Sequence, residues 1–141
     1  INKDQGVVLD GAIRSVEQAD HYQNHFKDKG LEDQVLAIEV ALTAEDSFNR
    51  LANRRVCADC KEIIPWLKST KDLTKCSKCN GELVTRKDDN AEVVKERIDK
   101  QGNSALEPIS SYYKDLGVYK KVDGSLSIEE VDKEIDKILK L

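Results

Sequence analysis

Four cysteines constrain this chain of 141 residues more than any other feature. They form two CxxC pairs, Cys57 with Cys60 and Cys76 with Cys79, and fifteen residues separate the pairs. Two thiolates from each pair can coordinate one tetrahedral ion, and this spacing is typical of zinc ribbons. We therefore predict a closed four-thiolate site for zinc, or for iron in its place. Such a site folds the residues between the pairs and leaves no open coordination position for catalysis.

Two other interpretations of the cysteines stay open at this point. A pair of disulfides suits a small secreted protein, but we find no signal peptide pattern and expect a core without crosslinks. A redox CxxC needs only one pair near the start of a helix, whereas both pairs here lie between turn residues. Because Asn80 and Gly81 follow the second pair, we expect a tight turn with positive φ there.

The charges of the chain are unevenly distributed. The stretch 50–87 holds ten Lys and Arg against four Asp and Glu, the other residues hold thirteen against twenty-three, and the net charge is −4. A basic insert on an acidic body attracts a polyanion, either the phosphates of a nucleotide or a nucleic acid. The acidic total argues against a nucleic-acid binder. Ordinary solvated surface equally explains five lysines of the insert: Lys61, Lys68, Lys71, Lys75 and Lys78.

Composition also bears on location and assembly. Charged residues make up 35% of the chain, and no apolar run approaches the roughly 20 residues that a membrane helix needs. We therefore expect a cytoplasmic protein with no membrane partner and no nucleic-acid partner. We expect a monomer, since no feature suggests obligate assembly. The sequence has no methionine and opens at Ile1, so we expect it to be the C-terminal part of a longer protein.

The first forty residues predict a strand, a helix and a second strand. Residues 6–9 form an apolar run that we expect to be a buried strand. A capping box places a helix start near Ser15, and Gly30 should end that helix. Residues 35–40 form a second apolar run, too continuous for a half-exposed strand. Strands buried on both faces are typical of parallel sheets.

The rest of the chain predicts three more helices and a strand around the cysteine insert. Thr43 caps the first helix, and a long helix follows a cap among residues 88–90. We expect Pro108 to kink or divide that helix. A strand over 118–122 and a helix capped by Ser127 come next. The last helix should bury Ile128, Val131, Ile135 and Ile138. This order predicts an α/β layered domain with a parallel sheet.

Arginines lie on both stems of the cysteine insert. Arg50 and Arg54 are spaced for one face of the helix before it, and Arg86 and Arg97 follow it. Guanidinium groups bind phosphate oxygens bidentately and stay charged, so this placement predicts a hinged flap that closes over phosphates. The alternative is that these arginines pair with acidic residues near helix ends, namely Asp88, Asp89 or Glu92.

Two further residues suggest chemistry. Asp10 follows the first expected strand and precedes Arg14, and ligands of open α/β sheets bind outside the carboxyl ends of the strands. A carboxylate there suits magnesium held through water, although an Asp-Gly pair is more often only a turn. Trp66, between the CxxC pairs, predicts a small core for the insert, with base stacking as the alternative.

Four blocks, in order along nearly the whole chain, resemble adenylate kinases. Asp10-Gly11-Ala12-Ile13-Arg14, with Gln18-Ala19, resembles the Asp-Gly-Phe-Pro-Arg segment of that family. Arg54-Arg55-Val56-Cys57 through Cys79-Asn80-Gly81, followed by Arg86-Lys87-Asp88-Asp89, resembles the zinc-containing lid of the bacterial long form. Residues 108–113 resemble the Pro-Leu-Ile-Xaa-Tyr-Tyr of a later helix, and Val122-Asp123-Gly124 resembles the turn before the last helix.

The resemblance implies a fold, a division into domains and an activity. The fold would be a partial P-loop-NTPase-like α/β core with a parallel sheet and an inserted zinc-ribbon lid. The first part of the core would span 1–53, the lid 54–87 and the second part of the core 88–141. The complete protein would catalyse ATP + AMP = 2 ADP with magnesium, ATP and AMP would be its partners, and zinc in the lid would be structural.

The resemblance also implies roles for single residues. Arg14 would contact the AMP phosphate and the transferring group, and Gln18 the AMP adenine. Arg50 would pack against the ATP adenine, and Leu126 would lie in the same nucleotide site. The residues that would clamp the phosphates as the lid closes, and support magnesium, are Arg54, Arg86, Arg97 and Asp10.

Three features depart from the family pattern. A Gly-rich loop ending in Gly-Lys-Gly-Thr and the AMP-binding segment that precedes Gly6 in the family are absent from these residues, so we expect no catalysis by this stretch alone. Ala12-Ile13 replaces Phe-Pro near the AMP site and leaves the acceptor open. Ile64 and Pro65 stand where the family has an aromatic residue and a histidine.

The alternative function is a zinc-ribbon module that engages a protein or nucleic acid through its basic flap.

Overall fold

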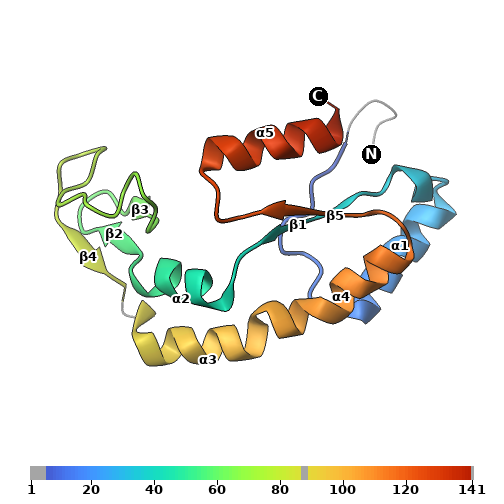
Figure 1. Ribbon diagram of the computed structural model, residues 1–141, viewed down its shortest axis with the longest axis horizontal. Helices are drawn as coiled ribbons and strands as arrows, with labels where there is room; N and C mark the ends of the chain where they lie inside the picture. The colour runs from blue at the N-terminus through green and yellow to red at the C-terminus, as the bar shows by residue number, and fades with distance from the viewer. Residues whose placement is uncertain (1–5, 87–88, 141) are drawn as a thin grey trace. The chain divides into compact units, whose positions relative to one another are not determined.

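The computed structural model describes residues 6–86 and 89–140, and Figure 1 shows its helices and strands. The chain divides into two compact units. The first contains Ile1–Glu39 and Ser104–Lys121, and the second contains Val40–Asn103 and Val122–Leu141. Lys87 and Asp88, where we placed the lid boundary and a candidate helix cap, lie outside the described residues. None of the helices in the described ranges combines the length and the apolar character that crossing a membrane requires.

The first unit is built on two helices and a buried core. Helix α1 (Val16–Asp28) begins where we predicted, because the Ser15 side chain accepts a hydrogen bond from the backbone of Gln18. The chain leaves it through Gly30 at φ 64°, a conformation that suits glycine. A short 3-10 helix, η1 (Glu32–Gln34), follows. Helix α4 (Asn103–Asp115) contributes most of its length to this unit. The core consists of Ala19, Ile109 and Tyr113.

A half-buried carboxylate also forms a hydrogen-bond network in the first unit. Glu39 Oε2 accepts hydrogen bonds from Ser110 Oγ at 2.6 Å and from Tyr119 Oη at 2.8 Å. Burial raises the pKa of Glu39, but these two donors outweigh it and the net shift is downward. Burial, together with the Glu39 carboxylate, raises the pKa of Tyr119 to about 12. The network joins Glu39 to Ser110 of helix α4 and to Tyr119, both of which lie far along the chain but belong to the same unit.

A parallel pair of strands forms the sheet of the core. Strand β1 (Ala37–Ala41) pairs with β5 (Tyr119–Asp123), as Figure 1 shows. The backbone N–H of Ala37 donates to Val118 O at 2.9 Å. The predicted α/β class with a parallel sheet is therefore confirmed. The expectation that 35–40 is buried on both faces was wrong, since the Val40 side chain is 50% exposed.

The predicted strand at residues 6–9 does not form. This segment has no strand hydrogen bonding, and Val8 is 93% exposed. A strand needs a neighbouring strand to satisfy its backbone groups. In the part of the chain that the structure describes, β1 and β5 pair only with each other. The apolar composition of 6–9 was therefore insufficient to produce a strand here.

The second unit places helix α2 (Ala44–Ala52) beside helix α3 (Ala91–Gln101) (Figure 1). Thr43 caps α2 as predicted, and Asn90 caps α3 by accepting from the backbone of Val93. Helix α2 ends at Ala52, so the prediction that Arg54 shares a helix face with Arg50 was wrong. Arg54 instead follows the helix C-cap at Asn53.

The helix after the insert is divided at Gly102 and not at Pro108. Gly102 caps α3 with an extended ψ of −158°, and α4 begins at the next residue. A Cβ at Gly102 would lie 2.3 Å from Ile98 O, so the break depends on glycine. Pro108 lies inside α4. The prediction of a division at Pro108 was wrong because Gly102, six residues earlier, already ends the helix.

Three short antiparallel strands form a sheet within the segment predicted to be the lid. Strand β2 (Arg55–Cys57) lies between β3 (Ile63–Ile64) and β4 (Leu83–Thr85). Val56 pairs with Ile63 on one side and with Val84 on the other. Cys57 and Ile64 are buried at 0% and 4% exposure. This small sheet brings the two CxxC pairs together from opposite ends of the insert.

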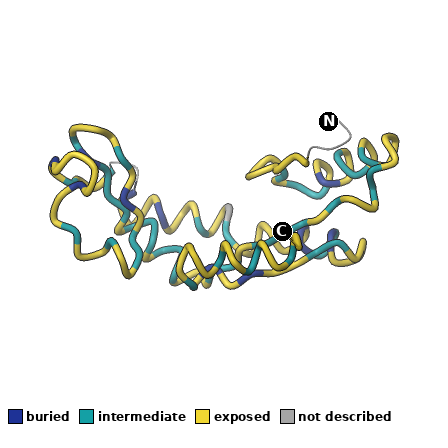
Figure 2. The backbone as a smooth tube through the Cα atoms, turned by 90° about the horizontal axis from the view of Figure 1, so that it is seen from above, coloured by how far each residue is buried: buried dark blue, intermediate teal, exposed yellow. Residues whose placement is uncertain are grey.

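The last helix, α5 (Ile128–Leu139), is capped as predicted but is not buried as predicted. Ser127 and Glu130 form a reciprocal capping box. Ile128 is 65% exposed, whereas Val131, Ile135 and Ile138 are half-buried. An amphipathic face is buried only where another element packs on it. Figure 2 shows that most of the described backbone is exposed or half-buried.

Candidate functional site

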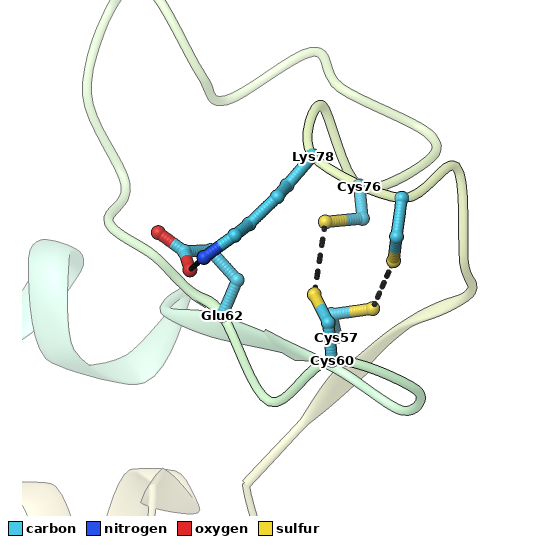
Figure 3. A network of polar contacts seen from close by, with 6 residues as sticks. Cys57, Cys60, Glu62, Cys76 and Lys78 are labelled. Atoms are coloured by element: carbon cyan, nitrogen blue, oxygen red, sulfur yellow. Dashed lines mark hydrogen bonds and ion pairs between the residues drawn. The ribbon is translucent and has the colours of Figure 1, made fainter.

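The four cysteine sulfurs lie together in the lid. All four Sγ atoms are within 4.8 Å of one another, and no disulfide joins them. Dashed lines in Figure 3 mark two sulfur–sulfur contacts, which measure 3.4 Å between Cys57 and Cys79 and 3.6 Å between Cys60 and Cys76. Zn–S bonds of ~2.3 Å in a tetrahedron place sulfurs ~3.8 Å apart, whereas a disulfide needs ~2.05 Å. The donor set and its spacing fit one zinc ion.

Both CxxC pairs fold into the same turn. In each, the residue after the second cysteine adopts positive φ, 60° at Lys61 and 63° at Asn80. Each turn is closed by two backbone hydrogen bonds of 2.8–3.2 Å: Cys57 N to Glu62 O, Lys61 N to Cys57 O, Cys76 N to Gly81 O, and Asn80 N to Cys76 O. The two turns therefore present their sulfurs in matching geometry.

Gly81 is required for space and not for its φ angle. We expected positive φ at both Asn80 and Gly81, but only Asn80 shows it. A Cβ at Gly81 would lie 2.2 Å from Asp59 Oδ2 and 2.9 Å from Cys57 Sγ. The second turn thus packs directly against the first, and only glycine permits this approach.

The sulfurs do not ionise independently. The backbone N–H of Cys60 outweighs burial and lowers the pKa of Cys57 to about 7. At Cys79 the N–H of Gly81 favours the thiolate, but the sulfurs of Cys60 and Cys57 oppose a further negative charge and raise the pKa to about 12. Four adjacent thiolates at neutral pH therefore require a compensating cation, which a bound metal ion would supply.

A salt bridge joins the two turns beside the sulfurs. Lys78 Nζ lies 3.1 Å from Glu62 Oε2 (Figure 3). Glu62, together with the sulfurs of Cys60 and Cys76, raises the pKa of Lys78. The pair is exposed, so its contribution to stability is small, but the lysine adds positive charge next to a four-thiolate site.

Arg55 organises the loop between the CxxC pairs, a role that the sequence did not distinguish from that of Arg54. Its guanidinium donates to Leu73 O at 2.5 Å, to Thr70 O at 2.9 Å and to Lys71 O at 3.0 Å. Trp66 lies over it, with the ring centroid 5.7 Å from Arg55 Cζ. Trp66 is half-buried and packs on the Arg55 guanidinium. The expectation that Trp66 forms a small core of the insert was therefore only partly met.

Arg54, by contrast, pairs with a buried carboxylate where the insert rejoins the core. Its Nε and Nη2 donate to Asp89 Oδ2 and Oδ1 at 2.9 and 2.7 Å. The Asp89 side chain is 2% exposed. The bonds from Arg54 outweigh burial and lower the pKa of Asp89, and the charges of Arg86 and Arg97 act in the same direction. Of the predicted phosphate-clamping arginines, Arg54 thus binds a carboxylate that we had considered only as an alternative ion-pair partner.

The remaining predicted nucleotide residues of the second unit lie near the turn after β5. Arg50 is half-buried in the last turn of α2. The pKa of Asp123 is lowered mainly by hydrogen bonds from Ser125 and also by the charge of Arg50. Leu126 is half-buried just before α5. Their roles toward a nucleotide stay predictions.

Asp10, Arg14 and Gln18 belong to the first unit. Asp10 and Arg14 are exposed in the segment before α1. Arg14 Nε donates to Gly11 O at 3.1 Å, and the Arg14 backbone N–H donates to Gln18 Oε1 at 2.7 Å. Gln18 therefore orders the approach to α1. The cleft that we predicted these residues share with the arginines of the second unit stays a prediction.

No protein-family model matches the chain. It is 35% identical to the adenylate kinase of Pyrococcus abyssi over 136 residues, which is 96% of this chain and 61% of the relative. It is 38% identical to the adenylate kinase of Elusimicrobium minutum over 142 residues, 99% of this chain and 64% of the relative.

A third relative, the adenylate kinase of Archaeoglobus fulgidus, is 35% identical over 139 residues. The chain spans about three fifths of the length of the curated relatives that it matches. Similarity at this level over nearly every residue of the chain, together with the α/β fold and the four-cysteine lid, reflects common descent. The chain is a homologue of the adenylate kinases.

Proposed function

We propose that this chain is the lid-bearing part of a nucleoside monophosphate kinase of the adenylate kinase type. The reaction would be ATP + AMP = 2 ADP. The observation that carries the proposal is the two-bond pairing of Arg54 with Asp89, just before helix α3, at a carboxylate whose pKa the charges of Arg86 and Arg97 also lower. Guanidinium groups suit a chain of phosphates, because they bind phosphate oxygens in a two-bond fork.

Phosphoryl transfer asks for positioning and charge neutralisation more than for covalent chemistry. An oxygen of the AMP phosphate attacks the terminal phosphorus of ATP, the bond to the ADP leaving group breaks, and the arginines balance the charge on the transferring oxygens. Arg54, Arg86 and Arg97 would hold the donor phosphates, and Arg14 would hold the acceptor. Closure of the lid would exclude water, which otherwise takes the phosphoryl group.

The metals would have separate roles. The sulfurs of Cys57, Cys60, Cys76 and Cys79 would hold zinc, which supplies folding energy to the lid and no chemistry. Magnesium bound with ATP would neutralise phosphate charge when present. Asp10 is the carboxylate that we propose for its support. The 141 residues contain no Gly-Lys-Gly-Thr loop, so we propose that they do not catalyse alone.

The acceptor site departs from the family pattern at Ala12 and Ile13, and the choice of acceptor can be tested directly. Gln18 would read the adenine of AMP, while Ala12 and Ile13 remove an aromatic wall and a rigid turn. A coupled ADP-formation assay on the complete protein, with AMP compared against GMP, CMP and UMP, tests both activity and acceptor. We expect AMP to give the highest kcat/KM. Absence of phosphoryl transfer by the intact protein would refute the proposal and favour a binding module that uses the exposed lysines of the lid.

The zinc proposal has its own measurement. We expect roughly one zinc per chain by elemental analysis, and loss of the β2–β4 sheet on chelation, because the thiolates repel one another without the cation. The emission of Trp66, the one tryptophan of these 141 residues, should shift to the red as its loop opens. Metal-free protein with unchanged emission would contradict a structural role for zinc.

A further inference from the structure

The two CxxC turns match in backbone but differ in charge. The first spans residues 57–62 and the second spans residues 76–81. Both have the same two closing hydrogen bonds and the same positive φ at the fifth residue. At the third residue, however, the first turn has Asp59 and the second has Lys78, and both side chains are exposed. Equivalent positions beside the metal site therefore carry opposite charges.

Each of these two side chains contacts the sixth residue of the opposite turn. Lys78 Nζ lies 3.1 Å from Glu62 Oε2, and Figure 3 shows the Lys78 side chain reaching across to it. The Asp59 carboxylate lies against Gly81, since Asp59 Oδ2 is 2.2 Å from the point that a Gly81 Cβ would occupy. The two contacts are equivalent in position, and the ion pair holds the Lys78 ammonium where the two turns meet.

The metal site would be negatively charged when loaded. A Zn²⁺ ion bound by four thiolates leaves two negative charges uncompensated. A nearby cation stabilises such a centre, and a nearby anion destabilises it. Glu62 chiefly, and the sulfurs of Cys60 and Cys76 in addition, raise the pKa of Lys78. The Lys78 ammonium and these sulfurs therefore stabilise each other's charge.

Asp59 brings a negative charge to the same site. Its Oδ2 atom and the Sγ atom of Cys57 lie 2.2 and 2.9 Å from a single point, the position of a Cβ at Gly81. The carboxylate is thus close to a sulfur of the four-cysteine site, and like charges at this range repel one another. The charge of Asp59 therefore opposes that of the thiolates, whereas the charge of Lys78 supports them.

We propose that Lys78 is a residue that retains the zinc: its ammonium, oriented by Glu62, compensates the negative charge of the zinc–thiolate centre. Asp59, at the equivalent position of the first turn, weakens zinc binding. The inference rests on the proposed zinc site and not on the kinase reaction. It predicts that the two equivalent positions affect zinc affinity in opposite directions. A salt bridge with a purely structural role predicts no such opposition.

The test measures the zinc affinity of the complete protein by competition with a chromophoric chelator at low ionic strength. Lys78→Gln removes the charge and keeps a long polar side chain. We expect its Kd for zinc to rise about tenfold, the lower end of the range for residues that support metal ligands. Lys71→Gln is the matched control, because Lys71 is an exposed lysine of the loop between the CxxC pairs and the change in net charge is the same. An unchanged Kd for Lys78→Gln, or an equal rise for Lys71→Gln, would overturn the proposal.

Asp59→Asn tests the opposite charge. It keeps the shape of the side chain and removes the repulsion, so we expect its Kd for zinc to fall about threefold. A gain in affinity cannot result from misfolding, which keeps the proposal testable if Lys78→Gln fails to fold. A higher Kd for Asp59→Asn would overturn the proposal.

Lys78→Arg separates charge from the identity of the side chain. Arginine keeps the positive charge and can pair with Glu62, so zinc affinity should stay within about twofold of the wild type. Raising the salt concentration to about 1 M should reduce the difference between Lys78→Gln and the wild type, because exposed charges are screened. A loss in Lys78→Arg as large as in Lys78→Gln, or a difference that does not depend on salt, would overturn the proposal. Failure of the kinase function is distinguishable, since zinc affinity is measured without catalysis.

Discussion

At the scale of single residues, the metal site depends on how closely two backbone turns approach. Gly81 has no room for a Cβ, because Asp59 and Cys57 occupy that space. Replacing Gly81 by alanine should therefore separate the two CxxC turns and lower the free energy of unfolding by about 1–3 kcal/mol. Zinc affinity should fall with it. The measurements are chemical denaturation and a competitive chelator titration.

Gly6→Ala is the control for Gly81→Ala, since nothing lies within 4 Å of a Cβ at Gly6 and the φ of Gly6 is not positive. It should leave zinc affinity unchanged. Equal zinc affinities for Gly81→Ala and Gly6→Ala would show that the turns do not need this close contact.

The positive φ of Lys61 offers the opposite test, a substitution that should stabilise. Lys61 and Asn80 occupy the same place in the two turns, and asparagine tolerates the left-handed region better than lysine. Lys61→Asn should raise the free energy of unfolding by about 0.5 kcal/mol. Lys68→Asn is the matched control, being an exposed lysine of the lid without positive φ. A destabilised Lys61→Asn would indicate that the bond from Lys61 Nζ to Ala58 O matters more.

At the scale of elements, the guanidinium group of Arg55 holds the loop between the CxxC pairs. Arg55 donates to carbonyls of Thr70, Lys71 and Leu73 from strand β2. Arg55→Met keeps the aliphatic stem and leaves these carbonyls without that donor, at a cost of about 2 kcal/mol. We expect faster proteolysis within 65–75 and a red shift of Trp66 emission, while zinc stays bound.

Arg14→Met is the control for the general effect of losing an arginine, because Arg14 is exposed and belongs to the first unit. Wild-type protease resistance in Arg55→Met would mean that the metal alone orders the loop. Metal loss in Arg55→Met would mean that the loop and the zinc site fold as one structure.

At the scale of the whole molecule, each unit contains a carboxylate whose pKa is lowered by its partners. In the first unit, burial raises the pKa of Glu39, but the bonds from Ser110 and Tyr119 prevail. In the second, Arg54 lowers the pKa of Asp89. A carboxyl group with a lowered folded-state pKa stabilises the protein above its unfolded pKa of about 4. That stability is lost as the pH falls through the folded-state value.

We therefore expect the free energy of unfolding to decrease below about pH 4. The decrease should be smaller for Asp89→Asn in the second unit and for Glu39→Gln in the first, because neither variant carries the titrating group. Urea denaturation between pH 7 and pH 3 measures this, and Asp99→Asn should follow the wild type. Acid release of zinc affects all variants alike, so identical pH curves for wild type and Asp89→Asn would contradict the assigned shift.

The sequence by itself determined the local features of this protein. Ser15, Thr43 and Ser127 cap their helices as predicted, because a cap bonds to a backbone group only three residues away. The spacing of the four cysteines predicted that their sulfurs meet, since each CxxC turn is closed within six residues. The resemblance of four blocks pointed to the adenylate kinases, and curated adenylate kinases are 35–38% identical to the chain over nearly its whole length.

Only the tertiary structure decided what distant residues do. Two adjacent arginines, Arg54 and Arg55, look alike in the sequence, yet one binds a carboxylate 35 residues away and the other binds loop carbonyls 15 to 18 residues away. The apolar run 6–9 stayed exposed because a strand requires a partner. Local hydrogen bonds depend on neighbours within one turn of chain, whereas burial and long-range pairing depend on which segments the fold brings together.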